Sequence, residues 1–137
     1  MGFTRSGSCV CEAVKFKITG EPEANFVCYC LDCRKNSGHL GQLIGKYASS
    51  DIVVDDKDSN IREWIVDKTE SGFPKHKVFC SRCGCTLWTK PMKFNGEKMM
   101  VRTTLLDEGF DTSLTPSKCL FGPEKEAYLG QVQSQYL

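Results

Sequence analysis

Hydrophobic and polar side chains alternate over several short stretches of this chain. Between residues 14 and 19, Val14, Phe16 and Ile18 alternate with two lysines and a threonine, which is the period of a half-buried strand. Similar runs, separated by residues that favour turns, predict β structure at residues 3–20 (a hairpin or two short strands), 26–27, 40–47, 52–54, 61–66, 75–79, 86–88 and 98–105. The chain is therefore predicted to be mainly β, built of many short strands.

Helix-forming patterns are few. Residues 34–38 predict one helical turn that ends at Gly38, and a short helix is expected near residues 124–129. The large side chains within the strand patterns are expected in the core: Trp64, Trp88, Met99 and Met100.

Length and composition limit the class of protein. With 137 residues and 40% hydrophobic content, residues 1–137 are predicted to form a single domain. No apolar run is long enough to cross a bilayer, and the first residues lack the apolar core of a secretory signal, so we expect a cytoplasmic protein in a reducing compartment. The chain has 18 basic and 17 acidic residues, so its charge does not predict a nucleic-acid-binding surface.

The nine cysteines carry the candidate chemistry, because seven of them form three motifs with the spacing of metal ligands. A separation of one or two residues lets a tight turn present two sulfurs to one metal ion, and soft thiolate ligands favour zinc. The groups are Cys9-Val10-Cys11, Cys28-Tyr29-Cys30-Leu31-Asp32-Cys33 and Cys80-Ser81-Arg82-Cys83. The last group is followed by Gly84, which can adopt a positive φ and close a zinc-knuckle hairpin.

We predict two zinc ions per chain with different coordination. Four cysteines would complete one tetrahedron: Cys9, Cys11, Cys80 and Cys83. Three would leave the other site one ligand short: Cys28, Cys30 and Cys33. A closed four-cysteine site is usually structural, whereas three protein ligands and an open position are typical of catalytic zinc.

Disulfide bonds are the alternative use of so many cysteines. The odd number of cysteines, the lack of a secretory signal and the tight Cys-x-Cys pairs argue against it. Cys85 could compete with Cys83 as a ligand, but a small buried residue is the expected role. Cys119 is expected to be a free core or surface thiol.

Three linked motifs resemble the glutathione-dependent formaldehyde-activating enzyme (GFA) family, which also includes centromere-protein-V-like members. The matching stretches are residues 7–11, 28–38 and 79–84, and their order and separation span about the first three quarters of the chain. The resemblance implies a mainly β, Mss4-like tent of short antiparallel strands with zinc-binding cysteine knuckles. It also implies a structural zinc on the four-cysteine set and a catalytic zinc on the three-cysteine set.

The family's named activity adds glutathione to formaldehyde, which makes it a carbon–sulfur lyase that can run in either direction. This chain departs from the family pattern at four positions. Glu12 replaces a glycine, Tyr29 stands where histidine is common, Cys85 where threonine is usual, and Tyr128 near an expected tryptophan. None of these changes removes a metal ligand, but they bear on which substrate is used.

A site with three thiolates polarises a carbonyl poorly but suits a fourth soft ligand, such as a substrate thiol. Glutathione carries two carboxylates, so Arg34 is the predicted cationic partner, with Lys35 and Ser37 as weaker candidates. Arg34 and Lys35 could instead belong to a solvated turn. His39 could shuttle a proton or simply pack, and Tyr29 could line the open zinc position or simply pack.

The predicted partner is therefore glutathione or another small-molecule thiol adduct, with no nucleic acid and no membrane, and the oligomeric state stays open. The sequence leaves three other functions open. The chain could be a non-catalytic zinc-stabilised binding module, or a diverged family member acting on a secondary metabolite or another thiol adduct. It could also be a redox switch in which the three-cysteine loop oxidises after metal loss.

Overall fold

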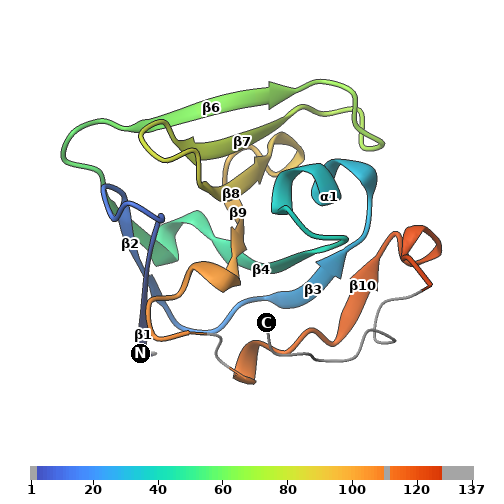
Figure 1. Cartoon of the computed structure of the whole chain (residues 1–137), viewed down its shortest axis with the longest axis horizontal. Coiled ribbons are helices and arrows are strands. Elements are labelled where there is room, and N and C mark those ends of the chain that lie inside the picture. Colours follow the sequence, from blue (N-terminus) through green and yellow to red (C-terminus); the bar gives the residue numbers. More distant parts are fainter. Residues whose placement is uncertain (1–2, 110–111, 128–137) are drawn as a thin grey trace, which may run out of the picture.

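The structure is a computed structural model that describes residues 3–109 and 112–127, and its strands form two sheets (Figure 1). The smaller sheet has the order β1-β2-β5, with antiparallel pairing throughout. Its strands are β1 (Thr4–Ser8), β2 (Lys15–Thr19) and β5 (Ile52–Asp55). Phe16 and Ile18 are buried on one face of β2 while the lysines beside them are exposed, as the alternation predicts.

The larger sheet has seven strands in the order β10-β3-β4-β9-β8-β7-β6. They are β10 (Lys118–Leu120), β3 (Ala24–Cys28), β4 (Gln42–Ala48), β9 (Lys98–Arg102), β8 (Thr86–Pro91), β7 (Lys75–Cys80) and β6 (Ile61–Val66). All neighbours are antiparallel except β10, which the sequence pattern did not predict and which pairs parallel to β3. The mainly β prediction is confirmed.

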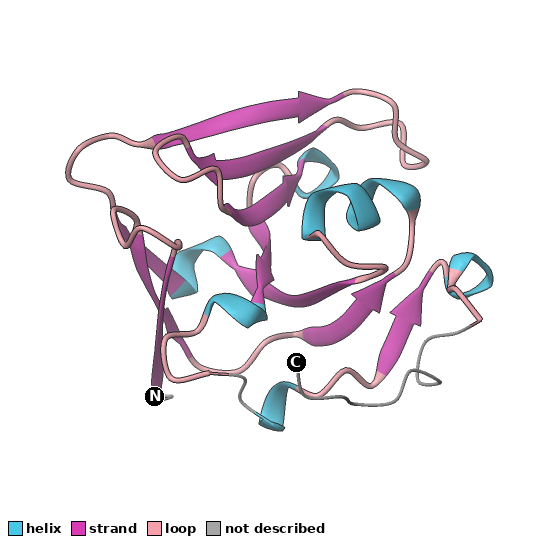
Figure 2. Ribbon diagram, viewed as in Figure 1, coloured by secondary structure: helices cyan, strands magenta, loops and turns pink. Residues whose placement is uncertain are grey.

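Helices are short, as Figure 2 shows in cyan. Among the described residues the single α-helix, α1 (Leu31–Ser37), begins three residues earlier than predicted and ends at Gly38, whose φ of 73° is the left-handed conformation expected of a glycine cap. It starts earlier because Cys30 caps it: the Cys33 amide donates to the Cys30 sulfur. The remaining helical elements are 3-10 turns: η1 (Ser49–Asp51), η2 (Met92–Phe94), η3 (Thr103–Leu105), η4 (Thr112–Leu114) and η5 (Gly122–Glu124).

Several predicted boundaries differ from the structure by one or more residues. Strand β4 begins at Gln42 instead of residue 40, and β9 ends at Arg102 because the chain turns there into η3. The helix expected at residues 124–129 was wrong over residues 125–127, which follow η5 without helix. Residues 128 and 129, including Tyr128, lie outside the described residues.

The main core lies between the two sheets. Phe16 of β2 meets Trp88 of β8 edge to face, with ring centroids 5.6 Å apart. Tyr47 of β4 and Val101 of β9 complete the buried centre of this cluster. A second, smaller core joins Phe26, Cys28, Cys33 and Ile44 beside α1.

The predicted core positions of Trp88 and Met99 are confirmed, and Met100 is half-buried. The prediction for Trp64 was wrong, because 68% of this residue is exposed. Trp64 lies on β6, the edge strand of the larger sheet, which pairs with β7 alone. The strand pattern alone did not show that β6 would have so little cover.

None of the helices within residues 3–109 and 112–127 has the length and apolar character needed to cross a bilayer.

Candidate active site and metal centres

The first candidate metal centre joins the two sheets. Cys9 and Cys11 lie in the turn between β1 and β2, whereas Cys80 ends β7 and Cys83 lies in the turn that leads to β8. The four sulfurs lie within 4.8 Å of one another and form the four-cysteine cluster. The sulfur–sulfur distance is 3.6 Å from Cys9 to Cys11 and 3.8 Å from Cys11 to Cys80.

These distances fit a tetrahedral thiolate site. Four sulfurs placed about 2.3 Å from one zinc ion would be separated by about 3.8 Å. Cys9 and Cys80 are almost completely buried in the main core, Cys11 is half-buried against it, and Cys83 is exposed. An ion held there would cross-link the turn of the smaller sheet to a hairpin of the larger one.

Backbone geometry aims these sulfurs at one point. Gly84 has a φ of 77°, and its amide donates to the Cys80 carbonyl at 2.7 Å, which closes the turn after β7. On the other side, Glu12 has a φ of 62°, a strained conformation for a residue with a side chain. The glycine usual at this position in the family would adopt it without strain.

The second candidate metal centre, the three-cysteine cluster, lies where β3 meets α1. Cys28 ends β3, Cys30 caps α1 and Cys33 lies in its first turn. Their sulfurs lie within 4.8 Å of one another, and that of Cys28 is 3.4 Å from that of Cys30. Among the described residues, no fourth cysteine, histidine or carboxylate completes this group.

The thiols of this cluster are electrostatically unequal. A hydrogen bond from the Cys33 thiol lowers the pKa of Cys28 to about 6, and the same contact raises the pKa of Cys33. The positive charge of Lys75 also lowers the pKa of Cys28. Thiolate character is therefore favoured at Cys28 near neutral pH, which is the form that binds metal ions.

A pocket of about 570 Å³, called here the cysteine pocket, opens beside the three-cysteine cluster. Its inner wall is apolar, formed by Phe26, Ile44 and Met100 from neighbouring strands of the larger sheet. Its polar side carries four lysines, Lys68, Lys75, Lys77 and Lys93, and three carboxylates, Asp32, Glu70 and Glu124. The three cysteines therefore adjoin a space large enough for a small-molecule substrate.

Two of these lysines contact Asp32, which lies between the cysteines of the loop. Lys75 Nζ is 2.6 Å from one Asp32 carboxylate oxygen, and Lys77 Nζ is 2.5 Å from the other. Burial favours a raised Asp32 pKa, but the hydrogen bonds from both lysines outweigh it and lower the pKa. Burial likewise opposes the charge of Lys75, but Asp32 outweighs it and raises the pKa of Lys75.

The residues predicted to bind glutathione do not line the cysteine pocket. Arg34 donates to the Glu126 carboxylate at 3.1 Å, while its buried Nε has no hydrogen-bond partner among the described residues. Lys35 is exposed on α1. Ser37 lies at the end of α1, where its hydroxyl donates to the His39 carbonyl and accepts from the His39 amide.

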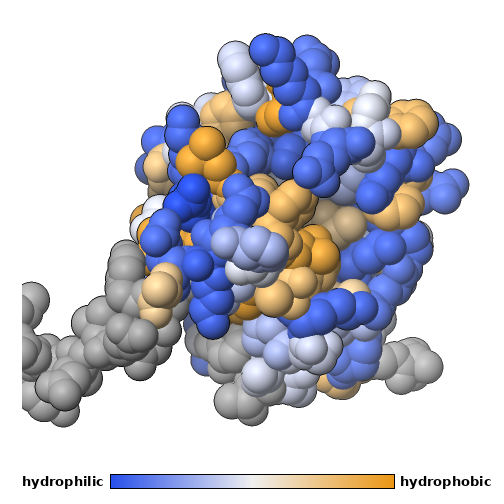
Figure 3. All heavy atoms as spheres, turned by 90° about the vertical axis from the view of Figure 1, so that its right-hand side faces the viewer, coloured by the Kyte–Doolittle hydropathy of each residue, from blue (hydrophilic) through white to orange (hydrophobic). Residues whose placement is uncertain are grey.

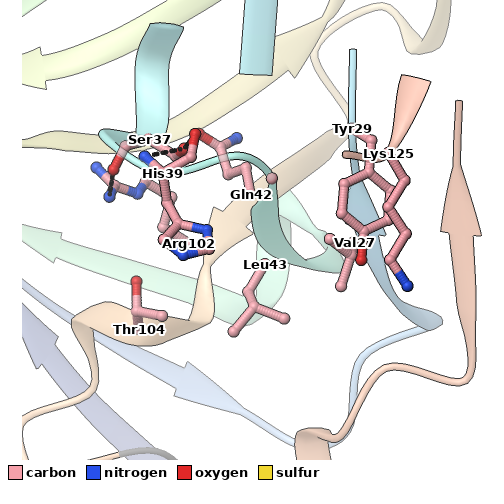
Figure 4. Close-up of a pocket in the computed structure, with 10 residues that line it drawn as sticks. Val27, Tyr29, Ser37, His39, Gln42, Leu43, Arg102, Thr104 and Lys125 are labelled. Carbon is pink, nitrogen blue, oxygen red and sulfur yellow. Dashed lines mark hydrogen bonds between the residues drawn. The ribbon is translucent and has the colours of Figure 1, made fainter. Parts of the chain in front are cut away.

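A second pocket, of about 520 Å³, is lined by several residues that the sequence analysis placed near the zinc site (Figure 4). Tyr29, Ser37 and His39 line it together with Val27 and other neighbours. Successive strand residues face opposite sides of a sheet, so Val27 points away from the cysteine pocket, which Phe26 and Cys28 line. Tyr29 packs closely against Gly41, where an added Cβ would lie 2.9 Å from its ring.

The two remaining cysteines lie outside both clusters. Cys85 is half-buried, packs against the main core and donates to the Thr86 carbonyl at 3.6 Å. Cys119 is exposed on β10. All nine cysteines are free thiols in the structure.

Sequence reasoning missed Lys75, Lys77 and the aromatic residues Phe73 and Phe121 as parts of the site. The available signal was the Lys-x-Lys alternation, which places Lys75 and Lys77 on one face of a strand that leads to Cys80. The missing information was that β7 lies beside α1, since 45 residues separate Lys77 from Asp32.

The fold and the two clusters define a mainly β protein whose sheets carry cysteine knuckles that could hold metal ions. The family model described as glutathione-dependent formaldehyde-activating enzyme matches residues 4–125. The chain belongs to this family, and its fold is Mss4-like.

A solved structure supports the same fold. The crystal structure of a Rhodobacter sphaeroides protein aligns with a TM-score of 0.62 and 19% sequence identity, covering 83% of this chain and 98% of that one. At this identity the likeness concerns the fold alone. No curated protein matches the chain.

Proposed function

We propose that this chain is a zinc-dependent carbon–sulfur lyase that adds glutathione to formaldehyde or another small electrophile, or releases it from the adduct. The observation that carries the proposal is the difference between the two clusters. The four-cysteine cluster has four thiols, two of them buried in the main core, whereas the three-cysteine cluster has one thiol fewer and borders a pocket of about 570 Å³. Membership of the family supports the same activity.

Zinc is the proposed ion at both clusters, two per chain, because all donors are thiols and the sulfur distances at the four-cysteine cluster suit a tetrahedron. When bound at the three-cysteine cluster, zinc would hold a substrate thiol as its thiolate at neutral pH. A reducing compartment such as the cytoplasm would keep the cysteines available for metal.

The protein's own residues would bind and orient the substrate. Two ammonium groups, on Lys75 and Lys77, share the single carboxylate of Asp32, so the wall beside the cysteines carries excess positive charge. This charge would attract a glutathione carboxylate. The apolar wall that includes Ile44 and Met100 would shield the reacting carbon from bulk water.

The sequence-based candidates Arg34, Lys35 and Ser37 remain predictions of glutathione contacts. Arg34 would have to exchange Glu126 for a substrate carboxylate, or use its unpaired Nε. Lys75 and Lys77 are the stronger candidates, because both line the cysteine pocket itself.

The test combines metal content with turnover. Protein purified anaerobically should contain two zinc ions by mass spectrometry, and glutathione should alter the more weakly held one. Exchange spectroscopy by NMR on mixtures of glutathione and formaldehyde should show faster formation of S-hydroxymethylglutathione than in buffer. A single tightly held zinc that ignores glutathione, with no acceleration of exchange, would indicate a non-catalytic zinc-stabilised module.

A further inference from the structure

Large hydrophobic side chains remain exposed around the mouth of the cysteine pocket. Leu31, Phe73, Leu120 and Phe121 all line it, and each is between 39% and 54% exposed. Figure 3 shows apolar atoms gathered on this side of the molecule, between hydrophilic neighbours. Single exposed apolar residues are common, but a group around one pocket indicates a binding surface.

These four residues, called here the apolar rim, come from three separate parts of the chain. Leu31 begins α1, Phe73 lies in the loop between β6 and β7, and the other two lie at the end of β10 and just after it. The rim continues inward to Phe26 and Ile44, which pack with Cys28 and Cys33 in the second core. One apolar surface therefore runs from the mouth of the pocket to the three-cysteine cluster.

The backbone holds Phe121 in an unfavourable conformation. Its φ of 56° and ψ of 42° are left-handed, a region that a bulky side chain rarely occupies. Glycine would adopt these angles without strain, and a glycine is present one position later, at Gly122. Strained conformations of this kind concentrate at ligand-binding sites, where the side chain they position is needed.

We propose that the electrophile handled at this site carries an aromatic or extended alkyl group, which the apolar rim binds. This substrate class deepens the proposed lyase function and rests on it. In the forward direction, a bond forms between the glutathione sulfur and the aldehyde carbon, and the thiol proton ends on the former carbonyl oxygen. Formaldehyde has no substituent that could reach the rim, so the rim selects larger aldehydes of the type R-CHO.

Binding of two stable thioethers tests the rim without turnover. S-hexylglutathione and S-methylglutathione share the peptide and differ only in the length of the alkyl group. Isothermal calorimetry on the purified protein should show at least about tenfold tighter binding of the hexyl compound, since each buried methylene adds affinity. Phe121→Gly should reduce this advantage to less than about threefold, and Phe73→Ser should reduce it partly.

Asn95→Gly is the matched control. Asn95 also has a left-handed conformation, with a φ of 54°, but it does not line the cysteine pocket. Asn95→Gly should melt near the wild-type temperature, and Phe121→Gly should keep a cooperative transition although it loses a partly buried side chain, while only Phe121→Gly should lose the preference for the hexyl group.

Any one of three outcomes would overturn the rim proposal. They are equal affinity for the two thioethers, failure of both to bind, and a preference for the hexyl compound that survives Phe121→Gly. Failure of the proposed function gives a different pattern. In that case the hexyl preference and its loss in Phe121→Gly would remain, while no aldehyde, with formaldehyde and phenylacetaldehyde as probes, would react faster with glutathione in the presence of the protein.

Discussion

Lys75 on strand β7 and Asp32 in the first turn of α1 form an ion pair of 2.6 Å beside the three-cysteine cluster. Lys77 contacts the other oxygen of the same carboxylate, so a single negative charge faces two positive ones. About a third of the Asp32 side chain is exposed, and such pairs add little to stability because solvent screens them. Their main consequence is the positive charge that they leave in the cysteine pocket.

Replacing Lys75 with methionine should therefore weaken glutathione binding more than it weakens the fold. We expect Lys75→Met to raise the glutathione dissociation constant about tenfold, because a charge-assisted contact contributes about 1.5–3 kcal/mol. The free energy of unfolding should fall by less than about 1 kcal/mol. Calorimetric titration with glutathione and urea unfolding measure the two effects.

Lys90→Met is the control for this experiment. Lys90 makes an ion pair of similar length and exposure, 2.7 Å to Glu63, but does not line the cysteine pocket. Lys90→Met should leave glutathione affinity unchanged. Equal weakening of glutathione binding by Lys75→Met and Lys90→Met would mean that the pocket lysines have no special role. Weakening by Arg34→Met alone would favour Arg34 as the glutathione partner.

Cysteine variants should separate the roles of the two clusters. Cys80→Ser should unfold the protein or lower its melting temperature sharply, since Cys80 is fully buried and its cluster joins the two sheets. Cys33→Ser should lower the zinc content from two ions to one while the cooperative unfolding transition survives. Metal analysis and thermal melting followed by circular dichroism test both variants.

The opposite pattern would contradict this assignment. A Cys80→Ser protein that melts cooperatively and a Cys33→Ser protein that does not fold would make the three-cysteine cluster the structural one. Stepwise chelation gives independent evidence. The first zinc removed should leave the near-ultraviolet circular dichroism nearly unchanged, and loss of the second should coincide with unfolding.

The strands and the grouping of cysteines were predictable because both signals are local. Alternation over five or six residues places Phe16 and Ile18 on the buried face of β2, and a separation of two residues brings Cys80 and Cys83 into one turn. The two distant halves of the four-cysteine cluster were assigned to one site because two pairs of cysteines complete a tetrahedron and because the family resemblance implies the same set.

The remaining features depend on which strands become neighbours. The exposure of Trp64 follows from the edge position of β6, and the contact of Lys77 with Asp32 follows from the packing of β7 beside α1. Alternation gives the face of each strand but not its neighbours. The apolar rim was missed for the same reason, because Phe73 and Phe121 are 48 positions apart in the sequence.

A pH-dependent contribution to stability is expected at Glu63, which contacts Lys90 at 2.7 Å and His76 at 2.9 Å. The hydrogen bond from Lys90 lowers the pKa of Glu63 from its usual value of 4.5. A lowered carboxyl pKa in the folded state stabilises the protein above the usual value, and this stabilisation is lost as the pH falls through the folded-state pKa.

Glu63→Gln should therefore reduce the free energy of unfolding by less than about 1 kcal/mol at pH 7, because the pair is partly exposed. The difference between the two proteins should shrink as the pH is lowered below 4.5. Urea unfolding of both proteins across this range measures it, and acid loss of metal affects both alike. A difference that grows on acidification would contradict the assignment.

Glu12→Gly should stabilise the protein by about 0.5–1 kcal/mol. Glu12 has a φ of 62° in the turn after Cys11, where its amide donates to the Cys9 carbonyl, and its side chain is exposed. Left-handed backbone costs about 1–2 kcal/mol for a residue with a Cβ, and the greater freedom of glycine in the unfolded chain offsets part of the gain. Urea unfolding of the zinc-loaded protein measures the difference. Glu12→Ala keeps the strain and removes the carboxylate, so it should give no comparable gain. Equal stabilisation by alanine and glycine would instead attribute the effect to the charge beside the four-cysteine cluster.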